Sequence, residues 1–185
     1  MRSAIPRPDA SEYAPYYGTY IAAAAATLEK SGQLDIRDLL LGQCDELETI
    51  VRDISEESAN NTYAPGKWSL KESIVHMCDA ERVFAYRALR IARGDQTPLA
   101  SFEQNDFVPV SRANTRALAD IFAEFRAVRA ASLALLNSFD NDAIDRVGTA
   151  SDRLVSTRAL CWIIAGHATH HLGITRDRYV PALTA

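Results

Sequence analysis

The chain has 185 residues, of which 48% are hydrophobic and 24% charged, and its formal net charge at pH 7 is -4. This length suits one domain with its own apolar core, and the composition excludes an intrinsically disordered chain. The sequence shows no basic run or basic face, so we expect no nucleic acid as partner. The longest run of small apolar residues, residues 21–26, is too short to span a membrane and makes a poor signal peptide, which predicts a cytoplasmic protein without a membrane partner.

The three cysteines, Cys44, Cys78 and Cys161, lie far apart in the chain, and none belongs to a CxxC pair. Their odd number and wide spacing argue against a disulfide framework and against a zinc knuckle. We therefore interpret all three as small buried apolar side chains.

The chain begins with a segment that precedes the main helical pattern. Its prolines predict a loose first dozen residues, while the alanine-rich residues 16–30 predict a helix. Gly32 ends this helix, because glycine is common just past a helix end. We expect a partly helical N-terminal segment over residues 1–33 and the main domain over residues 34–185.

Two helices are predicted in the first half of this domain. Residues 35–55 carry apolar side chains at steps of three and four, which places those side chains on one helical face. The second helix opens with a capping box formed by Ser69 and Glu72. It ends at Arg93, just before Gly94.

Two further helices complete the pattern. An apolar stripe predicts a helix over residues 114–138, and the last helix starts after Ser156 and stops before Pro181. We find no alternating run of β-branched residues long enough to predict a strand. Four helices of similar length, each with an apolar stripe, predict an all-α fold built as a four-helix bundle.

Two of the connections between these helices are long, residues 95–113 and residues 139–155. Loops of this length are often functional. They also allow a chain to cross between helices that are not neighbours, and the sequence leaves both interpretations open.

The last helix carries two histidines on the centre of its apolar stripe. His167 and His171 are one turn apart, the spacing at which two imidazoles can bind the same metal ion. His170 lies roughly 80–100° away from their common direction, which favours a flanking position. The alternative is a pair of core histidines with hydrogen-bond partners, and the spacing alone does not decide between the two. No glutamate follows His167, so this is not the HExxH motif of zinc peptidases.

Two other polar residues are predicted to lie inside the bundle. His76 falls on the flank of the apolar arc of its helix, so periodicity alone does not select it as a ligand. Glu81 lies on the centre line of the same stripe, and a buried carboxylate needs a partner. We expect an ion pair with an inward arginine such as Arg178 on the last helix. A role as general base or neighbour of a metal site is the alternative.

Several of these features occur together in a known order. The segment YAPGKWSLKE (residues 63–72) is followed by His76 and Asp79, and the segment GHATHH (residues 166–171) lies on the last helix. A tryptophan that opens a helix, a histidine eight residues later and a final HxxxH resemble the DinB/YfiT-like superfamily. The similarity extends over residues 34–180.

The resemblance implies a four-helix bundle that holds a divalent metal ion, zinc or nickel, on three histidines. Carried over residue by residue, the implied ligands are His76, His167 and His171. Three protein ligands leave one position open for water or substrate, as in catalytic zinc sites.

The resemblance leaves several functions open, because members of a fold family differ in their chemistry. The first hypothesis is a metal-dependent enzyme acting on a small-molecule substrate, either a hydrolase or a transferase that uses a low-molecular-weight thiol. The second is a non-catalytic metal-binding or stress-response protein, and the third a bundle without metal. A homodimer is compatible with the sequence.

Overall fold

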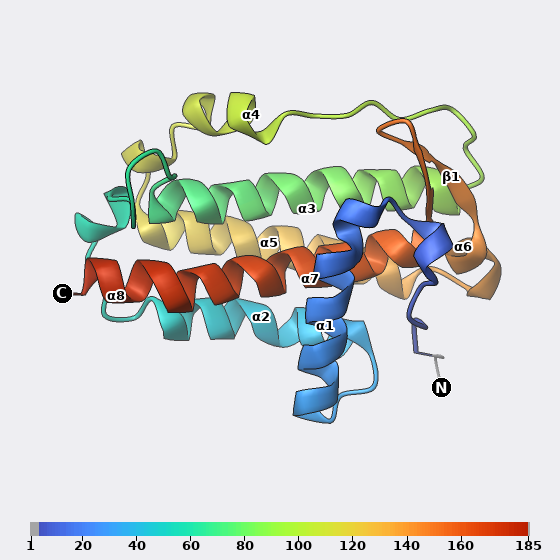
Figure 1. Cartoon of the computed structure of the whole chain (residues 1–185), viewed down its shortest axis with the longest axis horizontal. Helices are drawn as coiled ribbons and strands as arrows, with labels where there is room; N and C mark the ends of the chain where they lie inside the picture. The colour runs from blue at the N-terminus through green and yellow to red at the C-terminus, as the bar shows by residue number, and fades with distance from the viewer. Residues whose placement is uncertain (1–3, 185) are drawn as a thin grey trace.

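Four long helices run along the bundle axis in the computed structural model, which describes residues 4–184 (Figure 1). They are α2 (Ile36–Ile50), α3 (Leu70–Ala92), α5 (Leu118–Asn137) and α7 (Thr157–Ile174). Helix α3 packs against both α5 and α7, and α2 closes the other side by packing against the same two helices. The predicted all-α four-helix bundle is confirmed. Residues 1–3 and residue 185, at the ends of the two predicted segments, lie outside the described residues.

The connection between α3 and α5 returns the chain to the start of α3. It contains the short helix α4 (Gln104–Val110) and runs back along the bundle (Figure 1). At its end, Asn114 contacts the N-terminus of α3, where its Oδ1 accepts a hydrogen bond from Ser69 Oγ at 2.6 Å. Helices α3 and α5 therefore run in the same direction, and the long loop serves as a crossover.

The ends of α3 follow from local side-chain chemistry. Ser69 Oγ accepts a hydrogen bond from the backbone N–H of Glu72 at 3.1 Å, and Glu72 Oε2 accepts one from Ser69 N–H at 2.8 Å. These two bonds satisfy backbone donors that would otherwise lack partners at the helix start. At the other end, Gly94 has a positive φ of 83°, which stops the helix. Both features confirm the prediction from sequence.

The limits of two other helices differ from the prediction. Helix α2 ends at Ile50, not at residue 55, although Val51 and Ile54 are buried. A turn folds these two side chains into the same core, so the apolar pattern continues beyond the helix. Helix α5 begins at Leu118, after a 3-10 turn at Ala113–Thr115, and not at residue 114.

The prediction that the chain contains no strand is wrong. After the short helix α6 (Asn141–Asp145), strands β1 (Val147–Ala150) and β2 (Arg153–Ser156) pair antiparallel and form a hairpin. Its two turn residues, Ser151 and Asp152, have φ values of 52° and 59°, as a tight hairpin turn of this type requires. Four-residue strands without an Asn-Gly or Asp-Gly turn give a weak signal in sequence, which explains the error.

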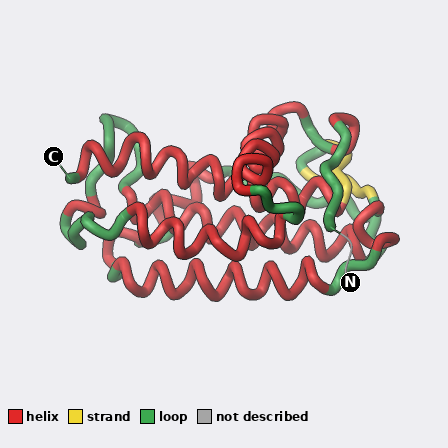
Figure 2. The backbone as a smooth tube through the Cα atoms, turned by 90° about the horizontal axis from the view of Figure 1, so that it is seen from below, coloured by secondary structure: helices red, strands yellow, loops and turns green. Residues whose placement is uncertain are grey.

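The N-terminal helix α1 (Gly18–Ser31) crosses α7 and stands out from one side of the bundle (Figures 1 and 2). The crossing requires Gly166, because a Cβ atom there would lie 2.1 Å from the backbone oxygen of Tyr20. This close approach places Tyr20 beside the histidines of α7. Beyond α7 the helical backbone continues without a break through a π-helical turn (Thr175–Tyr179) and the short helix α8 (Val180–Leu183), so the prediction that the last helix stops before Pro181 is wrong. Pro181 fits because it lies in the first turn of α8.

The three cysteines are buried and unpaired, as the sequence predicted. Burial raises the pKa of the Cys161 thiol to about 12 and also raises the pKa values of Cys44 and Cys78. The thiols are thus inert small side chains of the core. Among residues 4–184, no helix combines the length and apolar character needed to span a membrane.

Candidate metal centre

Three of the four histidines meet inside the bundle. His76 lies on α3, and His167 and His171 lie one turn apart on α7. The Nε2 atoms of His76 and His167 are 3.1 Å apart, and one ring nitrogen from each of the three residues lies within 4.8 Å of the others. All three side chains are buried, with exposed fractions of 3%, 5% and 7%. The structure therefore brings together the three residues that the sequence resemblance implied.

The arrangement of helices explains why His76 takes part. Helix α3 packs closely along α7, so a residue on the flank of the apolar arc of α3 faces the neighbouring helix rather than the centre of the bundle. The ring of His76 lies 5.0 Å from that of His167 and 4.9 Å from that of His171. Periodicity predicts the buried face of a helix, whereas the choice of neighbour depends on the tertiary fold.

His170 points away from this cluster. Its side chain is exposed and its ring lies 5.3 Å from that of Tyr20, outside the group of nitrogens. The angular argument from sequence thus places His170 correctly on the flank of α7.

Burial keeps the three inner histidines neutral. It lowers the pKa of His76 to about 4 and holds the pKa values of His167 and His171 well below the usual 6.5, with further lowering by the neighbouring histidines. A neutral imidazole is the form that binds a metal ion. The cluster is therefore ready to bind a metal without first losing protons at pH 7.

The donor set fits one divalent metal ion. Two nitrogen ligands of a tetrahedral zinc ion, with bonds of about 2.0–2.1 Å, lie about 3.3 Å apart, close to the 3.1 Å between His76 and His167. Ser73 Oγ lies 3.5 Å from Nδ1 of His171, which leaves Nε2 of that ring to face the cluster. Within residues 4–184, this is the one group of three or more histidine, cysteine or acidic side chains with such convergent geometry.

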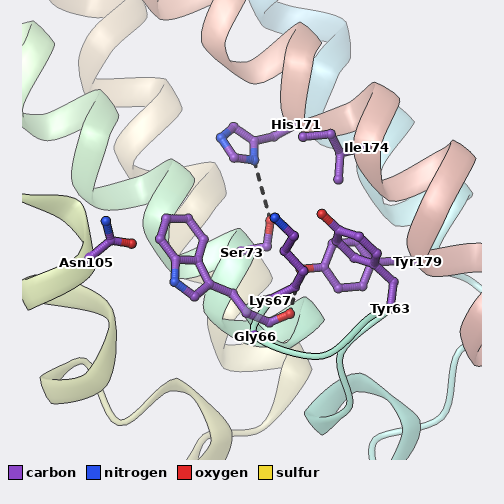
Figure 3. A pocket seen from close by; sticks show the side chains of 9 residues that line it. Tyr63, Gly66, Lys67, Ser73, Asn105, His171, Ile174 and Tyr179 are labelled. Atoms are coloured by element: carbon purple, nitrogen blue, oxygen red, sulfur yellow. Dashed lines mark hydrogen bonds between the residues drawn. The ribbon is translucent and has the colours of Figure 1, made fainter.

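Two cavities flank the cluster. The larger, about 360 Å³, borders His76 and His167, and Asn105 of α4 contributes to its wall. Five aromatic side chains line it: Tyr16, Tyr17, Tyr20, Phe84 and Phe102. The smaller, about 230 Å³, borders His171 and is lined among others by Lys67, Trp68 and Ser73 (Figure 3). Small molecules can therefore approach the histidines from two sides.

The wall of the larger cavity is held by Arg87, a residue that the sequence did not single out. Its buried guanidinium donates from Nη2 to Ala100 O at 2.7 Å and to Ser151 Oγ at 2.9 Å. The guanidinium carbon also lies 5.8 Å from the ring centroid of Phe102. Burial raises the pKa of the adjacent Tyr17 to about 12, so this phenol stays protonated. Arg87 thus joins the crossover loop and the hairpin beside the cavity.

Glu81 does not belong to the metal centre, and its predicted partner is wrong. Its carboxylate pairs with Arg129 of α5, whose Nη2 lies 2.8 Å from Glu81 Oε2. Arg178 is exposed in the π-helical turn. The next residue, Tyr179, donates a hydrogen bond to Trp68 O just before α3, so the turn with Arg178 lies at the start of α3. Glu81 lies in the middle of α3, away from that turn. The structural interpretation of Glu81 holds with a different arginine.

Comparisons with known proteins agree with this fold. A solved structure of YfiT from Bacillus subtilis, described as a probable metal-dependent hydrolase with an unusual four-helix bundle topology, matches with a TM-score of 0.70. The match covers 97% of this chain and 91% of that one at 13% identity, so the likeness is one of fold. No curated protein matches the sequence. A family model of the DinB superfamily matches residues 39–175, and the chain therefore belongs to the DinB superfamily.

Proposed function

We propose that this protein is a metal-dependent hydrolase of small molecules, with one divalent metal ion bound by His76, His167 and His171. The observation that carries the proposal is the buried cluster of three neutral imidazoles between two cavities. Zinc and nickel both suit nitrogen ligands, and we propose one of the two as the native ion. The description of YfiT as a probable metal-dependent hydrolase supports hydrolysis as the reaction.

When bound, the metal supplies a Lewis acid that activates a small nucleophile near neutral pH. The chain itself supplies position and shielding. Ser73 orients the ring of His171, and the rings of Trp68 and Phe84 lie 4.8 Å from His76 and 5.8 Å from His167. These apolar neighbours lower the local dielectric, which strengthens electrostatic interactions with a bound substrate.

The paired cavities favour a second candidate reaction. Two spaces that border different histidines of one cluster could hold two reactants, as transfer of a low-molecular-weight thiol to an acceptor requires. In this case the thiol loses its proton, its sulfur forms a bond to the second molecule, and a leaving group departs from that molecule with the electron pair of the broken bond. A non-catalytic metal protein is less well supported, because its site needs no access for small molecules.

The proposal can be tested on protein purified without a histidine tag. We expect about one divalent ion per chain and hydrolysis of an activated ester such as 4-nitrophenyl acetate. Chelation and the His76→Ala substitution should both abolish turnover, since each removes the metal. The matched control is His170→Ala, which alters a histidine of α7 outside the cluster.

The outcomes separate the three classes of function. Turnover of 1-chloro-2,4-dinitrobenzene only in the presence of a small thiol would favour transfer over hydrolysis. A bound metal without turnover of either probe, together with unfolding on chelation, would favour a non-catalytic protein. Absence of bound metal in protein reconstituted with zinc or nickel would contradict the proposal.

A further inference from the structure

The smaller cavity has a charge that the proposed function does not use. Of the nine residues that line it, Lys67 is the one lysine or arginine, and His171 belongs to the histidine cluster. The other side chains are aromatic, apolar, hydroxyl or amide groups, and no carboxylate is among them. This cavity therefore has a positive charge in a chain whose formal net charge is -4.

Lys67 has no anionic partner within residues 4–184. The nearby Lys71 differs in this respect, since its ammonium lies 2.8 Å from a carboxylate oxygen of Glu56. Lys67 is an exposed residue at the edge of the cavity, and Figure 3 shows its side chain turned towards Ser73 and His171. An ammonium without an anionic partner among the described residues thus borders the same cavity as the ring of a candidate metal ligand.

A tight turn gives Lys67 this direction. The backbone N–H of Lys67 donates to Ala64 O at 3.2 Å, and Gly66 between them has a positive φ of 72°. Proline followed by a glycine with positive φ is the sequence of a type II turn. The segment YAPGKW therefore fixes the position of the lysine just before α3, which explains a motif that the metal centre leaves unused.

We propose that this cavity binds the carboxylate of the substrate, with Lys67 as the residue that selects it; this inference rests on the proposed function. One ammonium balances the single charge of a carboxylate, whereas a phosphate group carries about -1.5 to -2 at pH 7. The hydroxyl of Ser73 and the amide of Asn105 are further donors in the lining.

The rest of the lining fits an apolar body of modest size. Trp68 and Tyr63 offer aromatic faces and Ile174 an aliphatic one. The volume of about 230 Å³ lies below the range of about 300–1,000 Å³ that is usual for sites of drug-sized ligands. The substrate class is therefore a small carboxylic acid derivative whose reacting bond lies on the His171 side of its carboxylate.

Benzoate is a suitable probe, and benzamide is its neutral counterpart. Their dissociation constants can be measured by NMR titration or calorimetry with the metal-loaded and the chelator-treated protein, and inorganic phosphate serves as the competing anion. The variants are Lys67→Gln and Lys67→Arg. Lys30→Gln is the matched control, because it removes the same charge from the exposed end of α1.

We expect benzoate to bind more tightly than benzamide and phosphate in both forms of the protein. Lys67→Gln should raise the dissociation constant of benzoate about tenfold, since a hydrogen bond to a charged group is lost, while Lys67→Arg and Lys30→Gln should change it less than about threefold. Binding to the metal-free protein keeps this test independent of whether the protein is a metalloenzyme.

Four results would overturn the proposal. The first is that benzoate fails to bind the metal-loaded or the chelator-treated protein, and the second is equal affinity for benzoate and benzamide. The third is that Lys67→Gln and Lys30→Gln change the dissociation constant of benzoate equally, and the fourth is that phosphate binds more tightly than benzoate. If benzoate binding requires the metal and Lys67→Gln has no more effect than Lys30→Gln, benzoate binds the metal itself. That outcome also overturns the proposal.

Discussion

Glu81 and Arg129 form a bidentate ion pair inside the bundle, with Arg129 Nε 3.0 Å from Glu81 Oε1 and Nη2 2.8 Å from Oε2. Arg129 Nη1 also donates to Gln43 Oε1 at 2.9 Å, and Gln43 Nε2 donates to Ala165 O at 3.0 Å. This network connects α3, α5, α2 and α7. The network lies between the two clusters of buried apolar side chains that form the core, and it links all four helices there.

Substituting one partner of this pair should destabilise the fold. Glu81→Gln leaves the guanidinium of Arg129 buried without its counter-charge, which we expect to lower the free energy of unfolding by about 3 kcal/mol. Urea denaturation measures the loss. Metal content should stay that of the wild type, because Glu81 is outside the histidine cluster.

An exposed ion pair provides the control for this substitution. Glu48 accepts a hydrogen bond from Arg126 on the surface of the bundle, and Glu48→Gln should change stability by less than about 1 kcal/mol. If Glu81→Gln left stability unchanged but removed the metal or the activity, Glu81 would be part of the site.

Gly166 should be essential for docking of α1. In Gly166→Ala the new methyl group would lie 2.1 Å from Tyr20 O, so α1 has to move away from α7. We expect a loss of about 1–3 kcal/mol, as for other overpacked sites, and faster proteolysis within α1. Gly173→Ala is the control on the same helix, since a Cβ there meets no atom within 4 Å. Equal protease resistance of the two variants would contradict the close crossing of α1 and α7.

Removal of the metal should leave the bundle folded. Two clusters of buried apolar side chains fill the core independently of the histidines, and apolar burial contributes roughly 25 cal/mol per Å². We expect the chelator-treated protein to keep its helical circular dichroism and a cooperative thermal transition with a lower midpoint, because a ligand of the folded state stabilises it. Loss of helicity on chelation at room temperature would instead identify a structural metal.

The metal-free protein should lose stability in mild acid. Burial lowers the pKa values of His76, His167 and His171 in the folded state, so the unfolded chain binds more protons as the pH falls below about 6.5. The stability that depends on these neutral residues is complete above that pH and falls as the pH decreases. For His76 the decrease ends near its folded-state pKa of about 4. Each residue contributes up to about 1.4 kcal/mol per pH unit.

Denaturation between pH 6.5 and 5 isolates this effect, because most carboxylates titrate lower. His76→Leu should make the slope of the free energy of unfolding against pH shallower by an amount equal to about one bound proton. A free energy of unfolding that is independent of pH over this range would show that the histidines are not held neutral.

Local patterns in the sequence predict the helices and pair two of the three candidate ligands. The capping box of Ser69 and Glu72 acts within four residues, and the pairing of His167 with His171 follows from one helical turn. The resemblance to a family added His76, which periodicity did not select. The capping box and the spacing of His167 and His171 depend only on neighbours in the chain, so both can be predicted without knowledge of the fold.

Features that depend on how helices are arranged could not be predicted. The partner of Glu81 is Arg129 because α3 packs against α5, and no pattern in either helix specifies that choice. The tyrosines of the N-terminal segment reach the site only because α1 crosses α7 at Gly166. The sequence shows Lys67, but its place beside the cavity and its lack of an anionic partner among residues 4–184 depend on the fold.

Metal content of the histidine variants tests the central proposal most directly. Protein reconstituted with zinc and then desalted should contain about one ion per chain, because three nitrogen ligands form one site. His76→Ala, His167→Ala and His171→Ala should each lose most of that ion, whereas His170→Ala should keep it. Equal losses for His170→Ala and His171→Ala, or full retention after removal of any of the three inner histidines, would contradict a metal centre on His76, His167 and His171.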